Sequence, residues 1–127
     1  MDTKYFIYLC IFQYLMDRKT NTTCNDPRGE ALLIIHHIVS TYLFFGPFFF
    51  NPLHHLIFCL ITLIHWFTYK VGTGCILTVY TNKYCGNKID KPFFDLFRAF
   101  GLALPNFFHH WFLLAMIILY DLCLVHS

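Results

Sequence analysis

Histidine is the residue type with the most chemical potential in this sequence, which holds eight of them. They are His36, His37, His54, His55, His65, His109, His110 and His126. Most lie inside long apolar runs, where an ionisable side chain is costly to bury and therefore points to a functional role. Neutral imidazole is also the commonest side-chain ligand of metal ions in proteins. The histidines are thus the first candidates for chemistry.

Three sets of these histidines are predicted to lie at one depth. The sets are His36 with His37, His65 alone, and His109 with His110. Each stands about five residues from one end of an apolar run, and a helix rises about 1.5 Å per residue, so each lies about 7–9 Å below the same surface. Neighbouring residues differ by about 100° around a helix, so a His-His pair should direct one imidazole toward the bundle axis.

Histidine side chains at one depth in a helical bundle could bind either of two kinds of cofactor. All five residues are candidate cofactor ligands, because two histidines from facing helices can clamp the iron of haem b. Three histidines can instead hold a transition metal such as zinc, copper or iron, and the candidate metal ligands are His37, His65 and His110. A second site toward the opposite surface would draw on His55 or His126.

The alternative interpretation of the histidines is structural. A level just below the surface is also where amphipathic side chains sit in a membrane, and His65-Trp66 and His110-Trp111 are typical of an aromatic belt. An imidazole can simply donate a hydrogen bond to a carbonyl on a neighbouring helix. Both interpretations need helices to position the side chains.

Composition predicts which solvent those helices face. The chain has 127 residues, of which 57% are hydrophobic and only 13% charged, against about 25% charged residues in a typical soluble protein. The net charge of +2 is too small to favour nucleic acid as a partner. We therefore expect a single all-α domain, a polytopic membrane helical bundle. Its expected partners are the lipid bilayer and a second membrane protein or another copy of the chain.

The apolar runs predict three firm spans and two shorter helices. The spans are residues 31–50, 53–69 and 106–125, with a short N-terminal helix at 5–16 and an interfacial helix at 93–104. A bilayer core needs about 20 apolar residues, so the N-terminal helix is short for a span. Gly46-Pro47 should kink the first span, and Asn51-Pro52 is a turn signal. The second span is predicted to return along the first as an antiparallel hairpin.

The basic residues predict the orientation of these spans. Eight of the nine, all except Lys4, lie in or beside the polar loops 17–30 and 70–92. The positive-inside rule places such loops in the cytoplasm or its viral-interior equivalent, with the C-terminus outside. The glycosylation sequon at residues 21–23 would then be unused. Loop cysteines Cys24, Cys75 and Cys85 would stay reduced in that compartment.

No enzyme signature is present. The sequence has no Gly-x-Ser-x-Gly motif, no phosphate-binding glycine loop and no pair of carboxylates within an apolar run. Asp121 is the one acid deep in such a run, and it stands near the end, where a snorkelling interfacial position is expected. Cys59 and Cys123 are expected to pack as small apolar residues. No catalytic residue is predicted.

One short segment resembles known families. His65-Trp66 followed by Gly74-Cys75-Ile76-Leu77-Thr78 is similar to small multi-pass membrane proteins of large DNA viruses. It is also similar to a bacterial four-helix membrane family with a Cys-Pro-Leu-Thr loop after a span. The resemblance covers roughly 15 residues; Ile76 replaces the proline, and residues 79–81 lack the family's glutamate. It implies a helical membrane bundle and a viral origin, and no activity.

The sequence therefore favours a non-enzymatic membrane component that acts through packing or partner binding. The alternative function is a haem- or metal-binding bundle in electron transfer, with the intramembrane histidines as ligands. A third hypothesis is a proton or ion conductor that uses the same histidines as a relay.

Overall fold

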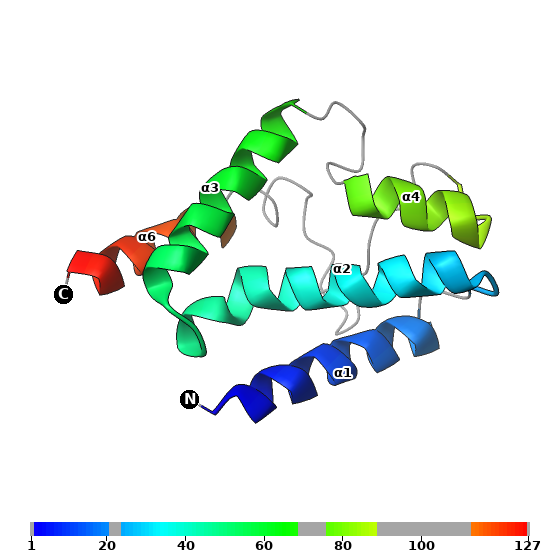
Figure 1. Ribbon diagram of the computed structural model, residues 1–127, viewed down its shortest axis with the longest axis horizontal. Helices are drawn as coiled ribbons and strands as arrows, with labels where there is room; N and C mark the ends of the chain where they lie inside the picture. Colours follow the sequence, from blue (N-terminus) through cyan, green and yellow to red (C-terminus); the bar gives the residue numbers. More distant parts are fainter. Residues whose placement is uncertain (1, 21–23, 69–75, 89–112, 127) are drawn as a thin grey trace.

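The computed structural model describes residues 2–20, 24–68, 76–88 and 113–126, and these contain helices and no strand. The helices are α1 (Thr3–Thr20), α2 (Pro27–Phe45), the 3-10 helix η1 (Gly46–Phe48), α3 (Pro52–Thr68), α4 (Ile76–Cys85) and α6 (Leu113–His126), as Figure 1 shows. The predicted all-α fold class is confirmed for this part of the chain.

Local sequence signals set the ends of α2 and the start of α3. Asp26 caps the N-terminus of α2 by accepting the backbone N–H of Arg28 at 2.8 Å, which satisfies a donor that has no partner within the helix. Pro47 cannot donate a backbone hydrogen bond, so α2 ends at Phe45 and the chain continues as η1. The Asn51 side chain then accepts the N–H of Leu53 at 2.8 Å at the start of α3.

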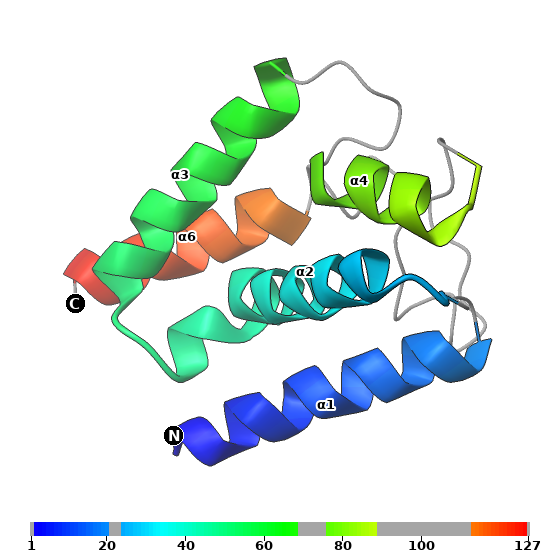
Figure 2. The ribbon, with the colours of Figure 1, turned by 45° about the vertical axis from the view of Figure 1, so that its right-hand side comes forward.

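Helix α2 is the central element. Helices α1 and α4 pack along it, whereas α3 rises away from α2 and packs against α6 (Figures 1 and 2). The predicted antiparallel hairpin of residues 31–50 and 53–69 is therefore wrong. The reason is that η1 and the turn through Asn51 redirect the chain, so α3 touches α2 only near the connection.

Two helices differ from the sequence expectation. Helix α1 covers the predicted helix 5–16 and continues to Thr20, through residues predicted as loop. Helix α4 lies within the predicted polar loop 70–92, and its buried residues are polar: Thr78, Thr81 and Asn82. An apolar-periodicity search misses such a helix because its inward face is not hydrophobic. The predicted helix 93–104 and the first part of the predicted span 106–125 lie outside the described residues.

Length and hydropathy identify one helical segment as a candidate membrane span in the described ranges. It is Pro27–Phe48, formed by α2 and η1, with 22 residues. The apolar helices Pro52–His65 and Leu113–His126 are shorter. At about 1.5 Å per residue, 22 residues reach about 33 Å, enough for a hydrocarbon core of about 30 Å.

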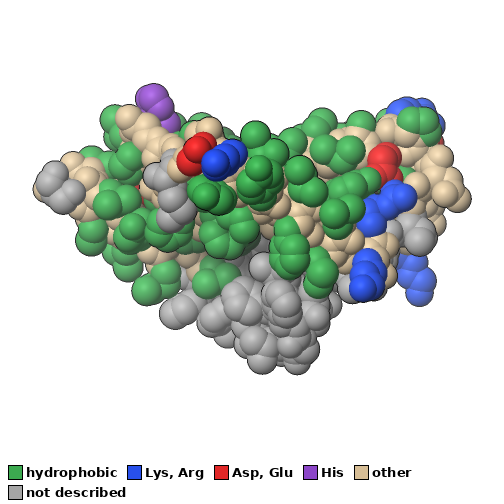
Figure 3. Space-filling model, turned by 90° about the horizontal axis from the view of Figure 1, so that it is seen from below, with side chains coloured by type: hydrophobic (Ala, Val, Ile, Leu, Met, Phe, Trp, Pro, Cys, Tyr) green, Lys and Arg blue, Asp and Glu red, His purple; other side chains and the backbone are tan. Residues whose placement is uncertain are grey.

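Among the described residues, buried polar side chains outnumber buried hydrophobic ones, which reverses the distribution typical of a water-soluble protein. In the described residues the buried hydrophobic side chains are Leu33, Leu43, Leu114, Cys24 and Cys59, while ten polar or charged residues are buried. Large apolar side chains are exposed on each α-helix of the described ranges; Ile61 and Ile64 of α3 are 60% and 62% exposed. Figure 3 shows apolar side chains over much of one face, with most of the visible Lys and Arg toward one end. The polar interior is where a functional site has to be sought.

Candidate functional site

Within the described ranges, buried ionisable side chains form two clusters that join helices. The first, the His37 cluster, consists of Gln13 and Asp17 from α1 with His37 and Thr41 from α2. The second, the His55 cluster, consists of His55 and Cys59 from α3 with Asp121 from α6. Each cluster joins two helices, α1 to α2 in the first and α3 to α6 in the second, so each holds the bundle together and offers a site for chemistry.

In the His37 cluster both ring nitrogens of the histidine are engaged. Nε2 lies 2.7 Å from Oδ2 of Asp17, and Nδ1 lies 3.1 Å from Nε2 of Gln13. The Gln13 amide N–H donates, so Nδ1 accepts and Nε2–H donates to the Asp17 carboxylate. The Thr41 hydroxyl donates to the backbone carbonyl of His37 at 2.7 Å. With Asp17 fully buried and His37 1% exposed, this is a polar seam between α1 and α2.

The His55 cluster is equally buried: His55, Cys59 and Asp121 are all 0% exposed. His55 Nδ1 lies 2.6 Å from Oδ2 of Asp121, and Cys59 Sγ lies 3.6 Å from that nitrogen and 3.9 Å from that oxygen. These three are the one group of His, Cys, Asp or Glu in the described ranges whose three potential ligand atoms all lie within 4.8 Å of one another. The group has the composition of a transition-metal site.

A glycine brings His55 against the end of α2. Nε2 of His55 donates toward the carbonyls of Tyr42 and Leu43, each 2.9 Å away. A Cβ on Gly46 would overlap Cδ2 of His55 and lie 2.9 Å from Nε2. Gly46 is therefore needed for this close approach.

The surroundings of the His55 cluster are apolar. Cys59 belongs to a core with Leu43 and Leu114, against which partly buried residues pack: Phe44, Phe58, Leu63, Ile117 and Ile118. Oδ1 of Asp121 is buried and has no hydrogen-bond partner among the described residues. An unsatisfied buried carboxylate oxygen in an apolar shell costs free energy and calls for an explanation.

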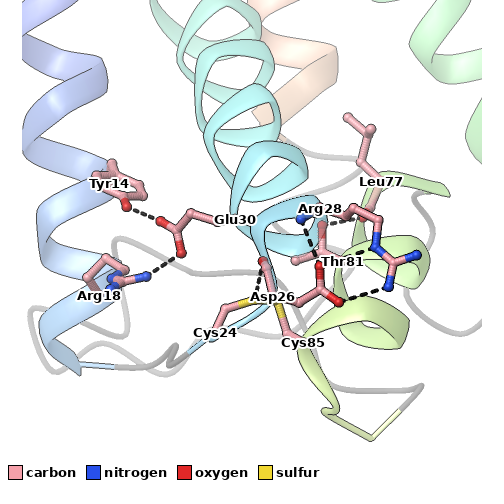
Figure 4. The surroundings of a disulfide bond; sticks show 9 residues. All are labelled: Tyr14, Arg18, Cys24, Asp26, Arg28, Glu30, Leu77, Thr81 and Cys85. Carbon is pink, nitrogen blue, oxygen red and sulfur yellow. Dashed lines mark hydrogen bonds and ion pairs between the residues drawn. A yellow bond between two sulfur atoms is a disulfide. The ribbon is translucent and has the colours of Figure 1, made fainter.

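A disulfide closes the opposite end of α2. Cys24 and Cys85 are bonded and connect the start of α2 to the end of α4 (Figure 4). The expectation that these two cysteines are reduced is therefore wrong, because the packing of α4 on α2 brings their sulfurs together; Cys75 lies outside the described residues. A Cβ on Gly29 would overlap Cys85 Sγ and lie 2.7 Å from Cys24 Sγ, so the close packing at the disulfide depends on a glycine there.

Charged side chains surround this disulfide on both sides (Figure 4). Glu30 accepts from Tyr14 and pairs with Arg18 of α1. Arg28 pairs with Asp26 at 3.0 Å and lies over the ring of Tyr84, 4.5 Å from its centroid. Hydrogen bonds from Arg28 hold the pKa of the Asp26 carboxyl below its ordinary value of 3.8. Ion pairs are thus concentrated beside the disulfide at the start of α2.

Three of the five predicted cofactor residues lie in the described part of the chain. His36 and His37 are buried on α2, and His37 contacts Asp17 and Gln13. His65 lies near the end of α3, where its Nε2 accepts the backbone N–H of Ile76 at 3.3 Å. His109 and His110 lie outside the described residues, so the five-histidine site remains a prediction. The contact from His65 to Ile76 does join two parts of the segment that carries the family resemblance.

Two site residues were missed or misread from the sequence. Asp121 is fully buried and paired with His55, so the expected snorkelling position is wrong. Asp17 was predicted to begin a loop, yet it is the buried partner of His37. The signal for Asp121 was present, since an acid within an apolar run requires a partner; nothing in the sequence marked Asp17, which precedes Arg18 and Lys19.

Comparison of the chain with protein-family models, curated proteins and solved structures gave no match.

Proposed function

We propose that this chain is a multi-pass integral membrane protein that acts as a structural or partner-binding component of its membrane. The observation that carries the proposal is the reversed polarity of the fold. Buried His37, His55 and Asp121 contrast with exposed apolar side chains on every α-helix that the structure describes. Lipid removes the cost of exposing such side chains, and it makes internal pairing of polar groups necessary.

Exposed apolar side chains on α3 and α6 support a partner. They include Ile61, Met116 and Leu119, which form an apolar surface that lipid or a helix of another membrane protein can cover.

We also infer an orientation in the membrane from the disulfide. Cystines persist in oxidising compartments and are rare in the cytosol, so the end that carries Cys24–Cys85 should face the lumen or the exterior. This reverses the orientation expected from the basic residues. The Cys24–Cys85 disulfide is the stronger indicator of orientation, because a stable disulfide needs an oxidising environment. The excess of Lys and Arg in cytoplasmic loops is only a statistical preference.

Membrane insertion is tested with a lysine at the exposed centre of α3. Ile61→Lys should reduce the fraction of the protein that resists alkaline extraction from membranes, since lysine at the centre of a span costs about 2.5–3.5 kcal/mol. Asn25→Lys, at an exposed polar position outside the helices, is the matched control and should have no effect. If Ile61→Lys left extraction unchanged, or wild type were recovered as a water-soluble protein, the membrane proposal would be refuted.

Orientation is tested by two readouts on the full chain. Cys24 and Cys85 should resist alkylation in acid-quenched cells unless a reductant is added. A glycan on Asn21, removed by Asn21→Gln, would place the adjacent Cys24 on the lumenal side, since the sequon precedes it directly. Two alkylated thiols and no glycan would instead support the cytoplasmic orientation.

The partner-binding role is tested by chemical cross-linking in intact membranes before mild detergent extraction. A specific cross-linked species, either a dimer of this chain or a complex with another membrane protein, is expected. Recovery of the monomer alone from membranes that hold it at its natural level would contradict the role. A metal-binding function has independent support in the His55 cluster.

A further inference from the structure

We infer that the His55 cluster is a binding site for one divalent transition-metal ion of the zinc type. The ligands are Nδ1 of His55, Sγ of Cys59 and a carboxylate oxygen of Asp121. This inference does not depend on the membrane orientation or on the structural role proposed above. It also differs from the five-histidine site that the sequence predicted.

The distances within the cluster are close to those of a tetrahedral site. With bonds of about 2.0–2.1 Å to nitrogen and oxygen and about 2.3 Å to sulfur, tetrahedral geometry separates sulfur from either lighter ligand by about 3.6 Å. Cys59 Sγ lies 3.6 Å from His55 Nδ1 and 3.9 Å from Asp121 Oδ2. The nitrogen and oxygen are 2.6 Å apart and must separate to about 3.3 Å for zinc. A side-chain shift of about 0.7 Å therefore completes three of four ligand positions.

The charge balance selects a dication. The 2.6 Å contact between His55 and Asp121 requires one shared proton, and Cys59 carries another as a thiol. With these two protons the site is neutral. A divalent ion that replaces both protons meets one thiolate, one carboxylate and a neutral imidazole, and the site remains neutral. This matters because all three residues are 0% exposed, where uncompensated charge is costly.

Two backbone carbonyls already orient His55 for this role. Carbonyl oxygens of Tyr42 and Leu43, each 2.9 Å away, can only accept, so Nε2 carries a proton and Nδ1 is the ligand nitrogen. Metal-binding histidines in proteins are held in the same way by a carbonyl or carboxylate on the second nitrogen. Thiolate and imidazole ligands also favour zinc over magnesium or calcium, which prefer oxygen.

An independent observation comes from the carboxylate. Oδ1 of Asp121 is buried and has no hydrogen-bond partner among the described residues. A pure helix-joining pair would leave that oxygen unsatisfied, whereas a metal ion can engage it, either directly or through a bound water. The three protein ligands leave a fourth position for such a water or for another donor.

The test is metal binding by the full chain purified in detergent and stripped with a chelator. Zinc titration against a competing chelator should give one tight site per chain and the release of two protons per ion. Cobalt should give thiolate-to-cobalt charge-transfer absorption. Cys59→Ala and Asp121→Asn should weaken zinc binding by about 100-fold or more, because losing only a residue that hydrogen-bonds to a metal ligand already costs about 10–100-fold. Cys123→Ala is the control, since Cys123 is an exposed cysteine on α6, and it should bind zinc normally.

Several results would overturn the site. They are the absence of tight zinc binding by the wild type, bound cobalt without thiolate absorption, and zinc affinity unchanged in folded Cys59→Ala. The cobalt spectrum is recorded on the wild type, so the proposal stays testable if the variants do not fold. Gly46→Ala gives a further check, because its methyl group would displace His55 and should weaken binding while all three ligands remain.

Discussion

The His37 cluster allows a quantitative test of how the polar interior stabilises the fold. Asp17 is 0% exposed and His37 1%, so neither can recover water when its partner is removed. His37→Leu leaves the Asp17 carboxylate buried without its imidazole, and the loss of one partner of a buried pair costs about 3–5 kcal/mol. Asp17→Asn keeps an acceptor of the same shape, so exchanging a charged for a neutral hydrogen bond should cost only about 1 kcal/mol.

The double variant Asp17→Leu/His37→Leu separates pairing from packing. Replacing both members of a buried ion pair by apolar side chains is often close to neutral, so the double variant should be more stable than His37→Leu alone. Asp17→Leu by itself leaves Nε2–H of His37 without this acceptor and should cost about 1–3 kcal/mol. The free energies of unfolding lost in the two single variants should therefore sum to several kcal/mol more than the loss in the double variant.

The assay is reversible unfolding of detergent-solubilised protein by a denaturing detergent, followed by far-ultraviolet circular dichroism. His54→Leu is the control, because His54 is an exposed histidine on α3 and surface substitutions usually change stability by less than about 0.5 kcal/mol. Additive losses in the double variant would show that Asp17 and His37 do not act as a pair, which would refute the reasoning. A His37→Leu variant as stable as wild type would do the same.

Three further predictions concern the disulfide-bonded end. The disulfide spans a sequence separation of 61, so Cys24→Ser/Cys85→Ser should lower the free energy of unfolding by about 4 kcal/mol; wild type that unfolds identically with and without reductant would contradict this. Gly29→Ala should cost about 1–3 kcal/mol in the same assay, since the added methyl group overlaps a disulfide sulfur and must be accommodated by shifts; equal stability would mean that the disulfide does not pack on Gly29. Arg28 holds the pKa of Asp26 below 3.8. The ionised Asp26 carboxylate therefore stabilises the fold above about pH 4, and this stabilisation is lost as the pH falls through the lowered pKa. Asp26→Asn keeps an N-terminal cap but should flatten that acid-side loss in a stability–pH profile, and an unchanged profile would be contrary to expectation.

The sequence by itself determined the class of the fold. Low charge and long apolar runs predicted helices, and the turn signals at Pro47 and Asn51 marked where α2 ends and α3 begins. These signals are local: a proline lacks a donor wherever it stands, and an asparagine caps the helix that follows it. The end of α2 therefore needed no knowledge of the rest of the molecule, whereas its start at Pro27 lies within the predicted loop 17–30.

Only the tertiary structure decided which polar residues meet. His55 and Asp121 are 66 residues apart in sequence, and His37 and Asp17 are 20 apart, so neither pairing is visible in a helical periodicity. Depth along a helix can be counted from the sequence, and this count predicted that His36 and His65 lie at the same depth below one surface. The direction in which α3 leaves α2 depends instead on η1 and on the packing of α6. That packing pairs His55 with Asp121 and places Cys59 beside them.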